Sequence, residues 1–586
     1  MPVDHGGELG LGDSRGERPR DRRERGHGQD GAGDVAPEGR RVGGLPADAL
    51  DAPGVVQQAE EGGVHEQRVL GPEVVGDLVG EDARRVRDLR DARLGTGPLS
   101  AEPRGHLDQV TPRRAPPVAR PDRRRTGRRR AGRCRRGFGS LLLHARIVCD
   151  TTWSRSLVSH TRKLRDMHRT EVVVTGLGAI TPLGGDVEST WNALLAGGSG
   201  IRGVVLPGHE AAGLPDVVAG TMAADPADSL PPVRARRLDR SQQAALVAAA
   251  EAWADAGAPR VDPDRLASAI GTGIGGVQTL LREDDALETA GARRVSPRTV
   301  PMLMPNAAAA LISIEYGARA GVHTPVSACS SGAEAIALGA GLIRAGEADV
   351  VIAGGTEAAI TPITVAGFVQ AQALSQYTAE PASASRPFAA DRSGFVLGEG
   401  AAVVVLESAE HAAARGARVR AVLAGAGVAA DAHHITAPVP DGSGQIAAMR
   451  KALARAGLAP EQITHVNAHA TGTQVGDVAE ARAIGKVFGR ATVTAPKAAL
   501  GHLFGAAGAI EALVAVLSVE HGVVPPTRNL AAAGVGPDID LDVVTERRDV
   551  PQEAVLSNSF GFGGQNVSLV VTGARHRSSR TAATTP

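Results

Sequence analysis

The stretch VSACSSGAEAIALGAGLIRAG, residues 326–346, carries more structural information than any other part of this 586-residue chain. An apolar run ends at Cys329, and small residues then lead into a segment in which Ile336, Leu338 and Leu342 recur at helical spacing. The pattern predicts a strand ending at Cys329, a sharp turn and an amphipathic helix. A strand that leads directly into a helix is typical of an α/β fold.

Cys329 has two interpretations at this point. A cysteine at a strand-to-helix turn faces the positive end of the helix dipole, which favours the thiolate over the thiol and creates a nucleophile. Its neighbours Ala328, Ser330, Ser331 and Gly332 are small enough for a sharp turn and leave room for a substrate. The structural alternative is a small buried core residue.

Further periodic segments favour the α/β class. EVVVTGLGAITPLG at 171–184 predicts a buried strand that enters a loop. Helices are expected at 240–257, 333–345, 446–456 and 505–520, and short strands at 349–353, 401–406, 463–467, 554–557 and 567–571. Alternating strands and helices indicate sheets covered by helices, and a core from 167 to about 575 is long enough for two related halves. No apolar run approaches the roughly 18 residues that span a bilayer, so no membrane association is expected.

Two histidines change the interpretation of the cysteine. VNAHATGTQVGD (466–477) carries a strand into a glycine- and threonine-rich loop at His469. APKAALGHLFGAAGAIEA (495–512) places Lys497 at a strand end and His502 five residues later. Polar groups at strand ends of an α/β fold converge on one crevice, so one cysteine and two histidines suggest nucleophilic catalysis. The spacing lacks the paired ligands of a zinc site, and no metal is expected.

Two glycine-rich motifs complete the survey. GTGIGG at 271–276 satisfies the dinucleotide pattern G-x-G-x-x-G, but no acidic residue lies between Glu288 and Glu315 to bind a ribose. We therefore predict a tight glycine turn and no cofactor. SNSFGFGGQNVSLVV at 557–571 surrounds Phe562 with glycines, which lets backbone N–H groups approach a substrate closely.

Residues 1–166 differ in composition from the rest of the chain. The first aromatic residue is Phe138 and the first isoleucine is Ile147. Such a segment cannot bury enough apolar area to offset its ordering entropy, so we expect disorder for most of residues 1–140. The missing residue types have AT-rich codons, as expected if GC-rich DNA upstream of the true start were translated, and Met167 is then the natural initiator. A genuine disordered extension is the alternative.

The net charge is zero, from 64 basic and 64 acidic side chains, but it is unevenly divided. Residues 1–166 hold 32 basic and 25 acidic side chains, and residues 167–586 hold 32 and 39. The arginine run at 123–136 could neutralise phosphates, but it lacks interleaved aromatic residues, so no nucleic-acid partner is expected. Three cysteines exclude a disulfide scaffold. The opening residues lack the charged start and apolar core of a secretory signal, and a cytoplasmic location is expected.

These motifs resemble those of the β-ketoacyl-acyl-carrier-protein synthases, decarboxylating condensing enzymes of the thiolase superfamily, and most of all the elongating synthase II of bacterial fatty-acid synthesis. The resemblance runs from about Glu171 to Val571, through SACSSG, ALS (373–375), GFVLGEGA (394–401), NAHATGT, the lysine–histidine pair and NSFGFGGQN. The chain departs from the family at Ala389 and Ser393, where acids are frequent, which puts a local acid–arginine network in doubt. NAHATGT also has alanine where the family commonly has glycine after the histidine.

The resemblance implies a thiolase fold with duplicated halves in a five-layered α-β-α-β-α arrangement. We place the halves at 167–418 and 419–575, followed by a flexible tail at 576–586. The implied reaction is a decarboxylative Claisen condensation without a cofactor. Cys329 accepts an acyl group from an acyl carrier protein, and the carbanion formed from malonyl-carrier protein attacks this thioester to give a 3-oxoacyl product. The implied partners are the acyl- and malonyl-loaded carrier protein and a second copy of the chain in a homodimer.

The resemblance also implies a role for each residue that handles the malonyl group. His469 and His502 would donate Nε2–H to the oxyanion that decarboxylation creates. Thr471 and Thr473 lie where the family contacts the malonyl carboxylate and the pantetheine arm. Lys497 would maintain the charge balance and the hydrogen bonds around His469.

Other implied roles concern acyl transfer. The N–H groups of Cys329 and Phe562 would form an oxyanion hole, and the Phe562 side chain would gate the acyl pocket. A single core cysteine argues against non-decarboxylating thiolases, and the retained nucleophile argues against a non-catalytic partner subunit. The ketosynthase subunit of a type II polyketide synthase has the same motifs and stays an alternative. Carrier docking is expected at the densest cationic cluster, which consists of Arg234, Arg236, Arg237 and Arg240.

Overall fold

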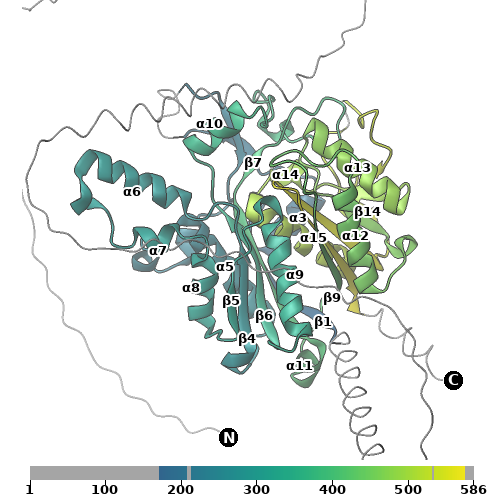
Figure 1. Ribbon diagram of the computed structural model, residues 1–586, viewed down its shortest axis with the longest axis horizontal. Helices are drawn as coiled ribbons and strands as arrows, with labels where there is room; N and C mark the ends of the chain where they lie inside the picture. The colour runs from purple at the N-terminus through teal and green to yellow at the C-terminus, as the bar shows by residue number, and fades with distance from the viewer. Residues whose placement is uncertain (1–169, 207–212, 531–532, 575–586) are drawn as a thin grey trace, which may run out of the picture. The chain divides into compact units, whose positions relative to one another are not determined.

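The computed structural model describes residues 170–206, 213–530 and 533–574 (Figure 1). The predictions for residues 1–166, namely disorder and a start at Met167, concern residues outside these ranges and stay predictions. The flexible tail expected at 576–586 also lies outside the described residues.

One large sheet of 11 strands dominates the described chain, in the order β13-β11-β10-β15-β16-β9-β1-β8-β6-β4-β5. Its strands are β1 (Val172–Ile180), β4 (Leu266–Gly271), β5 (Gly321–His323), β6 (Val350–Glu357), β8 (Gly400–Ser408), β9 (Ala421–Ala430), β10 (His465–Asn467), β11 (Thr492–Thr494), β13 (Asp542–Val543), β15 (Ala554–Gly561) and β16 (Gln565–Gly573). Two small sheets join β2 (Ile201–Val204) to β3 (Val217–Gly220) and β7 (Leu397–Gly398), and β12 (Val523–Val524) to β14 (Arg548–Asp549). Each strand expected from the sequence at 349–353, 401–406, 463–467, 554–557 and 567–571 overlaps one of these strands.

The large sheet consists of two copies of one five-stranded pattern and one additional edge strand, β13, which pairs parallel with β11. In the first copy β5, β4 and β6 run parallel, and β8 and then β1 join antiparallel. In the second copy β11, β10 and β15 run parallel, and β16 and then β9 join antiparallel. The copies meet where β1 pairs with β9. The boundary expected between residues 418 and 419 lies in the connection that leads into β9.

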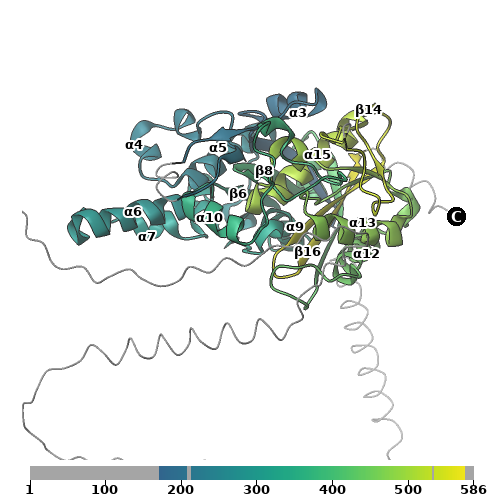
Figure 2. The same ribbon diagram turned by 90° about the horizontal axis from the view of Figure 1, so that it is seen from above.

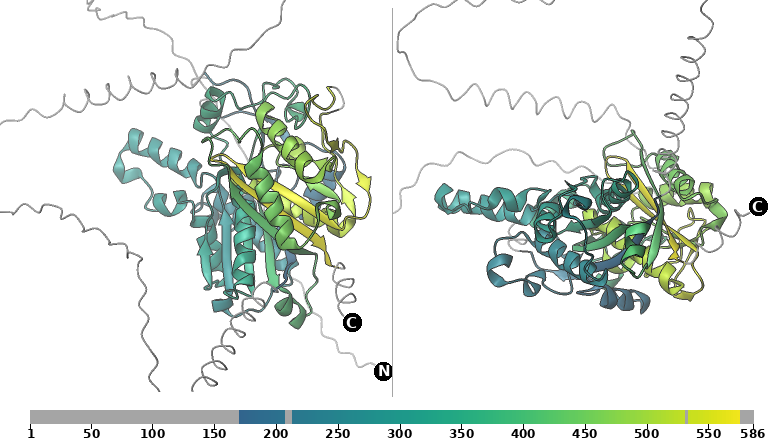
Figure 3. Two further views of the ribbon diagram at one scale, coloured as in Figure 1. Left: turned by 45° about the vertical axis from the view of Figure 1, so that its right-hand side comes forward. Right: turned by 90° about the horizontal axis from the view of Figure 1, so that it is seen from below.

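Helices cover both faces of each copy (Figures 1 and 2). They are α3 (Val187–Leu195), α4 (Pro232–Ala235), α5 (Arg240–Asp255), α6 (Val277–Ala290), α7 (Thr299–Leu303), α8 (Ala307–Tyr316), α9 (Ser331–Arg344), α10 (Pro362–Gln370), α11 (Ala409–Ala414), α12 (Ser443–Ala456), α13 (Gln474–Phe488), α14 (Lys497–Leu500) and α15 (Ala507–His521). Helices α5 and α8 pack on the outer face of the first copy, α12 and α13 on that of the second, and α9 and α15 contact each other and strands of both copies. The layers therefore follow the order α-β-α-β-α, which confirms the expected thiolase fold. Figure 3 shows the teal strands of the first copy beside the green and yellow strands of the second.

Matching glycines set how closely a helix approaches each copy. A Cβ atom added to Gly178 in β1 would lie 1.9 Å from the carbonyl oxygen of Ala248 in α5. A Cβ atom added to Gly427 in β9 would lie 2.0 Å from the carbonyl oxygen of Ala448 in α12. No side chain fits at such distances, so only glycine permits these contacts. The same contact in both halves is a local trace of the duplication.

Equivalent turns precede the two central helices. The short 3₁₀ turn η4 (Ala328–Ser330) leads into α9, and η7 (Phe504–Ala506) leads into α15. Each begins with a residue in the left-handed region, with φ of 51° at Ala328 and 44° at Phe504. The prediction of a strand that ends at Cys329 is wrong. β5 ends at His323, and the left-handed conformation of Ala328 cannot continue an extended strand.

The expectation that no apolar run approaches the length needed to span a bilayer is wrong for the segment that contains helix α15. The segment Phe504–His521 is 18 residues long with a mean hydropathy of 1.4, so one helix among the described residues is long and apolar enough to cross a membrane. However, 89% of this segment is buried inside the protein. Its composition follows from packing on all sides between the two halves of the sheet.

Candidate active site

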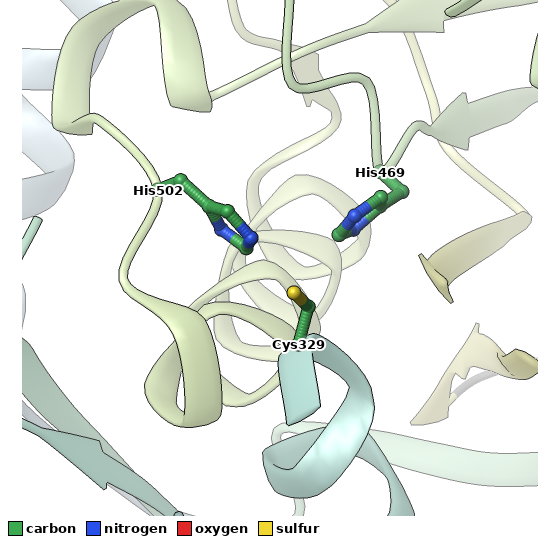
Figure 4. A group of neighbouring side chains, drawn as sticks. All are labelled: Cys329, His469 and His502. Carbon is green, nitrogen blue, oxygen red and sulfur yellow. The ribbon is translucent and has the colours of Figure 1, made fainter. Parts of the chain in front are cut away.

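Cys329, His469 and His502 come together from three separate parts of the chain (Figure 4). The Sγ atom of Cys329 and one ring nitrogen of each histidine lie within 4.8 Å of one another. The imidazole rings are nearly perpendicular, with centroids 5.4 Å apart. All three side chains are buried, with exposed fractions of 6%, 8% and 3%. The duplicated turns explain part of this convergence, because Cys329 lies in η4 and His502 lies two residues before η7.

Polar contacts hold His469 in place. It follows β10, and its backbone N–H donates to Glu480 Oε1 at 2.9 Å, while the N–H of Ala470 donates to Glu480 Oε2 at 2.7 Å. The Nζ atom of Lys497 lies 3.3 Å from His469 Nδ1. Because an ammonium group has no acceptor, Nδ1 must accept, and the ring proton of the neutral imidazole is then on Nε2.

Lys497 is the cation of this polar frame. It begins α14, is 2% exposed, and donates to the carbonyl oxygen of His469 at 2.6 Å. It also forms an ion pair with Glu511 of α15. Burial raises the pKa of Glu511 to about 7, although the charge of Lys497 and its hydrogen bond oppose this shift. Lys497 thus fixes both the tautomer and the backbone of His469.

His502 is held differently. Its backbone N–H donates to the Val396 carbonyl at 2.7 Å, and its own carbonyl accepts from Gly398 at 2.8 Å. Its ring stacks on Phe504 at 4.8 Å and meets the edge of Phe395 at 5.6 Å between centroids. The Nδ1 atom is buried and has no hydrogen-bond partner among the described residues. Aromatic packing, rather than a hydrogen bond, therefore orients this ring.

Both histidines are neutral in this environment. Burial lowers the pKa of His469 well below its usual range, and the charge of Lys497 and electrostatic coupling to His502 lower it further. Burial also lowers the pKa of His502 well below its usual range, with a further contribution from Lys497. A neutral imidazole donates one N–H, so the pair can offer two hydrogen bonds to a developing oxyanion.

The expectation that Cys329 favours the thiolate is wrong for the unliganded site. Burial raises the pKa of its thiol to about 11. The N–H of Phe562 and the charge of Lys497 lower this pKa, and the charge of Glu357 raises it. Loss of water around the sulfur therefore outweighs the helix terminus, and the thiol keeps its proton at neutral pH.

Backbone N–H groups nevertheless surround the sulfur. Those of Phe562 and of Cys329 itself lower the pKa of the thiol, against the effect of burial. The Oγ atom of Ser559 donates to the Cys329 carbonyl at 3.1 Å and ties the turn to β15. The side chain of Phe562 is 40% exposed, whereas the thiol is buried, so Phe562 lies on the solvent side of the nucleophile. This geometry fits the implied oxyanion hole and gate.

Thr471 and Thr473 lie on the loop that follows His469. Their hydroxyl oxygens are 3.2 Å apart. Asp477, in the first turn of α13, accepts the N–H groups of Thr471 and Gly472 at 3.1 Å each. Four consecutive N–H groups, from 469 to 472, are thus held by two carboxylates of one helix. The helix positions the threonines and His469 as one unit.

The acid–arginine network in doubt at Ala389 and Ser393 is rebuilt from other residues. Arg386 pairs with Asp391 at 2.7 Å and lies 4.1 Å above the ring of Tyr377. Arg392 donates to the backbone carbonyls of Ala389, Thr473 and Gln474, and its Nε is 3.8 Å from Asp477 Oδ2. This loop therefore remains attached to the threonine loop without the two missing acids.

Sequence reasoning missed the buried carboxylates of the site. Burial raises the pKa of Glu480 to about 7 and that of Asp477 to about 6. A signal was available, because Asp477 and Glu480 interrupt the buried side of α13 at a spacing of three residues. Glu511 is likewise a charged residue inside the apolar segment AGAIEALVAV of α15.

The GTGIGG motif forms the expected glycine turn between β4 and α6. Gly275 has φ of 86°, which favours glycine. The N–H groups of Gly273 and Ile274 donate to the carboxylate of Glu357 at 2.6 Å and 3.3 Å. A carboxylate of the protein itself therefore occupies the N–H groups that would otherwise bind a phosphate.

The cysteine and the two histidines could in principle coordinate a metal ion, since sulfur and imidazole nitrogen are zinc ligands. Lys497 opposes this, because its positive charge acts on all three groups. With a protonated thiol and two neutral rings, the donor set carries no negative charge of its own. The arrangement suits hydrogen-bond donation to an anion better than binding of a cation.

Comparison with known proteins agrees with the fold. Residues 169–412 match the N-terminal domain of β-ketoacyl synthases, and residues 420–531 match the C-terminal domain. The 3-oxoacyl-[acyl-carrier-protein] synthase 2 of Mycobacterium tuberculosis is 46% identical over 402 residues, which cover 68% of this chain and 96% of that protein. The enzyme of the same name from Coxiella burnetii is 41% identical over 413 residues, covering 69% and 99%.

Solved structures give the same result. A β-ketoacyl synthase from Burkholderia phymatum has 34% identity and a TM-score of 0.63, and the match covers 69% of this chain and all of that one. A type II polyketide ketosynthase, solved with its acyl-carrier protein and bound to the hexaketide, has 30% identity and a TM-score of 0.64, with coverage of 69% and 99%. The chain therefore belongs to the β-ketoacyl synthase family.

Proposed function

We propose that this enzyme condenses an acyl-enzyme thioester with malonyl-acyl-carrier protein in fatty-acid elongation, as a 3-oxoacyl-[acyl-carrier-protein] synthase II. The observation that carries the proposal is the buried group formed by one thiol and two neutral imidazoles within 4.8 Å. Relatives that are 41–46% identical over nearly their whole length are 3-oxoacyl-[acyl-carrier-protein] synthases 2. Purified protein should release CO₂ from malonyl-carrier protein and elongate acyl-carrier protein by two carbons; absence of both activities would refute the proposal.

The first half-reaction transfers the acyl group. The Cys329 sulfur attacks the thioester carbonyl, and the proton of its thiol passes to the departing pantetheine sulfur. The N–H groups of Cys329 and Phe562 stabilise the tetrahedral oxyanion. Because the thiol pKa is about 11 in the unliganded site, the thiol must lose its proton as it attacks. The acyl group carries no charge, so the thioester that it forms with Cys329 is compatible with an apolar environment.

The second half-reaction breaks and forms carbon–carbon bonds. Malonyl-carrier protein loses its carboxylate as CO₂, and the electron pair left behind forms an enolate. His469 and His502 donate N–H to the enolate oxygen, and Thr471 and Thr473 contact the malonyl carboxylate and the pantetheine arm. The enolate carbon then attacks the Cys329 thioester, which gives 3-oxoacyl-carrier protein and a thiolate that takes up a proton.

An apolar cluster beside Cys329 supports an acyl substrate. It is formed by Leu206, Val217, Ala219, Ile360, Val365, Phe395, Leu397 and Phe504. Burying a chain of methylene groups in such surroundings contributes about 0.8 kcal/mol per group. The cluster therefore favours a fatty acyl chain over a short polar acceptor.

A polyketide ketosynthase is the second candidate, favoured by the structural similarity to a type II polyketide ketosynthase at 30% identity and to the ishigamide ketosynthase/chain length factor at 32% identity. The two candidates differ in whether a partner subunit is needed. The purified chain should elongate long saturated acyl-carrier proteins of graded length on its own. A requirement for a second, cysteine-less homologue would instead support polyketide synthesis.

Of the four arginines expected to dock the carrier protein, two form ion pairs within the chain and two do not. Arg240 pairs with Glu399 and Asp225, and Arg234 pairs with Glu315. Arg236 and Arg237 are exposed and form no ion pair with any described residue. Charge reversal of these two should lower kcat/KM for carrier-bound substrates, most strongly at low salt, and leave a small malonyl thioester unaffected.

We also propose that the chain forms a homodimer. β5 forms an edge of the large sheet and exposes Val322 by 43%, and the nearby Val326 is 52% exposed. Helix α6, which extends away from the sheet in Figures 1 and 2, exposes Leu280 and Leu287 by nearly half. Unpaired edges and apolar faces of this kind favour a second copy as partner. Light scattering should give twice the monomer mass, and Val322→Lys should shift it toward the monomer.

A further inference from the structure

Glu357 is a buried carboxylate that the mechanism above does not use. It ends β6 and is fully buried. Its Oε2 accepts the N–H of Gly273 at 2.6 Å and of Gly505 at 3.1 Å, and its Oε1 accepts the N–H of Ile274 and the hydroxyl of Thr272. Three of these donors belong to the GTGIGG turn of the first half, and Gly505 belongs to η7 of the second. One side chain therefore joins the two duplicated halves beside the site.

The contact between Glu357 and Gly505 affects His502 through Phe504, the residue that precedes Gly505. Gly505 directly follows Phe504, whose ring supports the imidazole of His502 at 4.8 Å. His502 has no described hydrogen-bond partner on Nδ1, so its orientation depends on the rings packed around it. The backbone of η7 sets the position of Phe504. Glu357 acts on that backbone directly.

The packing around Gly505 leaves little freedom for an alternative arrangement. A Cβ atom on Gly505 would lie 2.4 Å from the backbone nitrogen of Gly273. Cβ atoms on Gly355 and Gly332 would lie 2.3 Å and 2.7 Å from the carbonyl oxygen of Gly505. Four glycine backbones thus meet at van der Waals distance, and the carboxylate of Glu357 binds across their junction. Without that carboxylate, the N–H groups of Gly273, Ile274 and Gly505 lose their acceptor.

We propose that Glu357 is a positioning residue that orients His502 for decarboxylation, by anchoring Gly505 and hence Phe504 to the GTGIGG turn. This inference rests on the proposed function, since it assigns His502 to the malonyl half-reaction. It gives the glycine motif a role in condensation instead of nucleotide binding.

A second observation separates positioning from mere folding. The groups whose charges act on Cys329 include Lys497, which lowers the pKa of the thiol, and Glu357, which raises it. The two neighbouring imidazoles are neutral. Replacing Glu357 by glutamine should therefore ease ionisation of the thiol while it weakens the support of His502. The two half-reactions should respond in opposite directions, whereas partial unfolding would impair both.

The experiment compares three variants of the full chain. Glu357→Gln removes the charge and replaces one acceptor oxygen by a donor, and Glu357→Asp keeps the charge but is too short to span the junction. Glu283→Gln is the matched control, because Glu283 is also buried and accepts a backbone N–H, from Ser296, but lies on α6 outside the site. For each protein we would measure ¹⁴CO₂ release from malonyl-carrier protein, the rate of Cys329 alkylation by iodoacetamide from pH 7 to 11, and the melting temperature.

The expected result is a loss of ¹⁴CO₂ release of about 10- to 100-fold in both Glu357 variants and little change in the control. Alkylation at pH 8.5 should be at least about threefold faster in Glu357→Gln, and close to wild type in Glu357→Asp. Release of ¹⁴CO₂ within twofold of wild type in both variants would overturn the inference, as would a parallel loss of release and alkylation. A wild-type protein that releases no ¹⁴CO₂ would instead refute the proposed function, and alkylation would still report on the Glu357 charge.

Discussion

The surroundings of His469 and His502 differ, although the two residues serve one oxyanion. His469 lies in a polar frame, in which Glu480 holds its backbone and Lys497 binds Nδ1. His502 lies in an aromatic frame of Phe395 and Phe504, with Nδ1 unpaired among the described groups. A neutral imidazole can therefore be held as an N–H donor in two ways. A cation can fix the tautomer, or stacking can fix the ring.

The difference predicts unequal sensitivity to mutation. A polar frame concentrates its effect in a few buried charges, each costly to leave unpaired. An aromatic frame divides its effect among several contacts, each worth about 0.5–1.5 kcal/mol. Changes in the frame of His469 should therefore be the more damaging.

The largest effect is expected for Lys497→Ala. The variant loses the donor to His469 Nδ1 and leaves Glu511 buried without its partner. We expect condensation to fall about 10³-fold, comparable to the loss of an oxyanion donor. The assay is radiolabelled malonyl incorporation, with Lys451→Ala as control, since Lys451 is exposed and caps only a carbonyl. A loss below tenfold would mean that the cation does not set the state of His469.

A smaller effect is expected for Glu480→Gln. The single amide oxygen of glutamine can still accept the N–H of either His469 or Ala470. Its NH₂ group is a donor and cannot accept the remaining N–H group. We expect ¹⁴CO₂ release to fall about 10- to 100-fold, while acylation of Cys329 changes little, because Glu480 contacts the loop of His469 and not η4. Equal losses in both half-reactions would show that Glu480 supports the whole site rather than His469.

The aromatic frame should tolerate Phe504→Leu better. Leucine fills most of the volume but cannot stack on the imidazole, so we expect a loss of up to about tenfold in decarboxylation. The position has φ of 44°, and both residues have a Cβ atom, so backbone strain is unchanged. A loss as large as that of Lys497→Ala would remove the distinction between the two frames.

The polar frame also predicts a dependence of stability on pH. Burial raises the pKa of Glu480 to about 7 from its ordinary value of 4.5. Between these values the folded chain keeps a proton that the unfolded chain releases, so the stability due to this group falls as pH rises from about 4.5 to 7. The full difference is at most about 3 kcal/mol. Denaturant unfolding at pH 5 and pH 8 should show a smaller decrease for Glu480→Gln than for wild type; equal decreases would contradict the shift.

Sequence patterns predicted the main elements and the residues that the structure brings together in the candidate site. The alternation of apolar runs gave α5, α9, α12, α15 and the central strands close to their observed bounds. Cys329, His469 and Lys497 were identified by motif and by their places at the ends of expected strands, and His502 by its motif five residues after Lys497. These features are local, because each depends on a short segment of chain.

Features that depend on several segments at once were not predictable. The apolar run before Cys329 is not a strand, because packing of η4 against the second half imposes a left-handed residue at Ala328. The thiol is not ionised, because burial is a property of the assembled fold rather than of the helix start. The role of Glu357 as an acceptor emerges only when segments distant in sequence meet. Pairing of Arg386 with Asp391 likewise replaces acids expected at other positions.

The central claim is that a thiol accepts the acyl group while two imidazoles drive decarboxylation, and one experiment tests it most directly. ¹⁴CO₂ release and radiolabelled acyl-enzyme formation would be measured for Cys329→Gln, His469→Ala and His502→Ala. We predict that Cys329→Gln forms no acyl-enzyme but still releases ¹⁴CO₂, because both donors remain. We predict that each histidine variant still acylates Cys329 but loses about 10²–10³-fold in release. Loss of release in Cys329→Gln, with release retained in His502→Ala, would contradict the account.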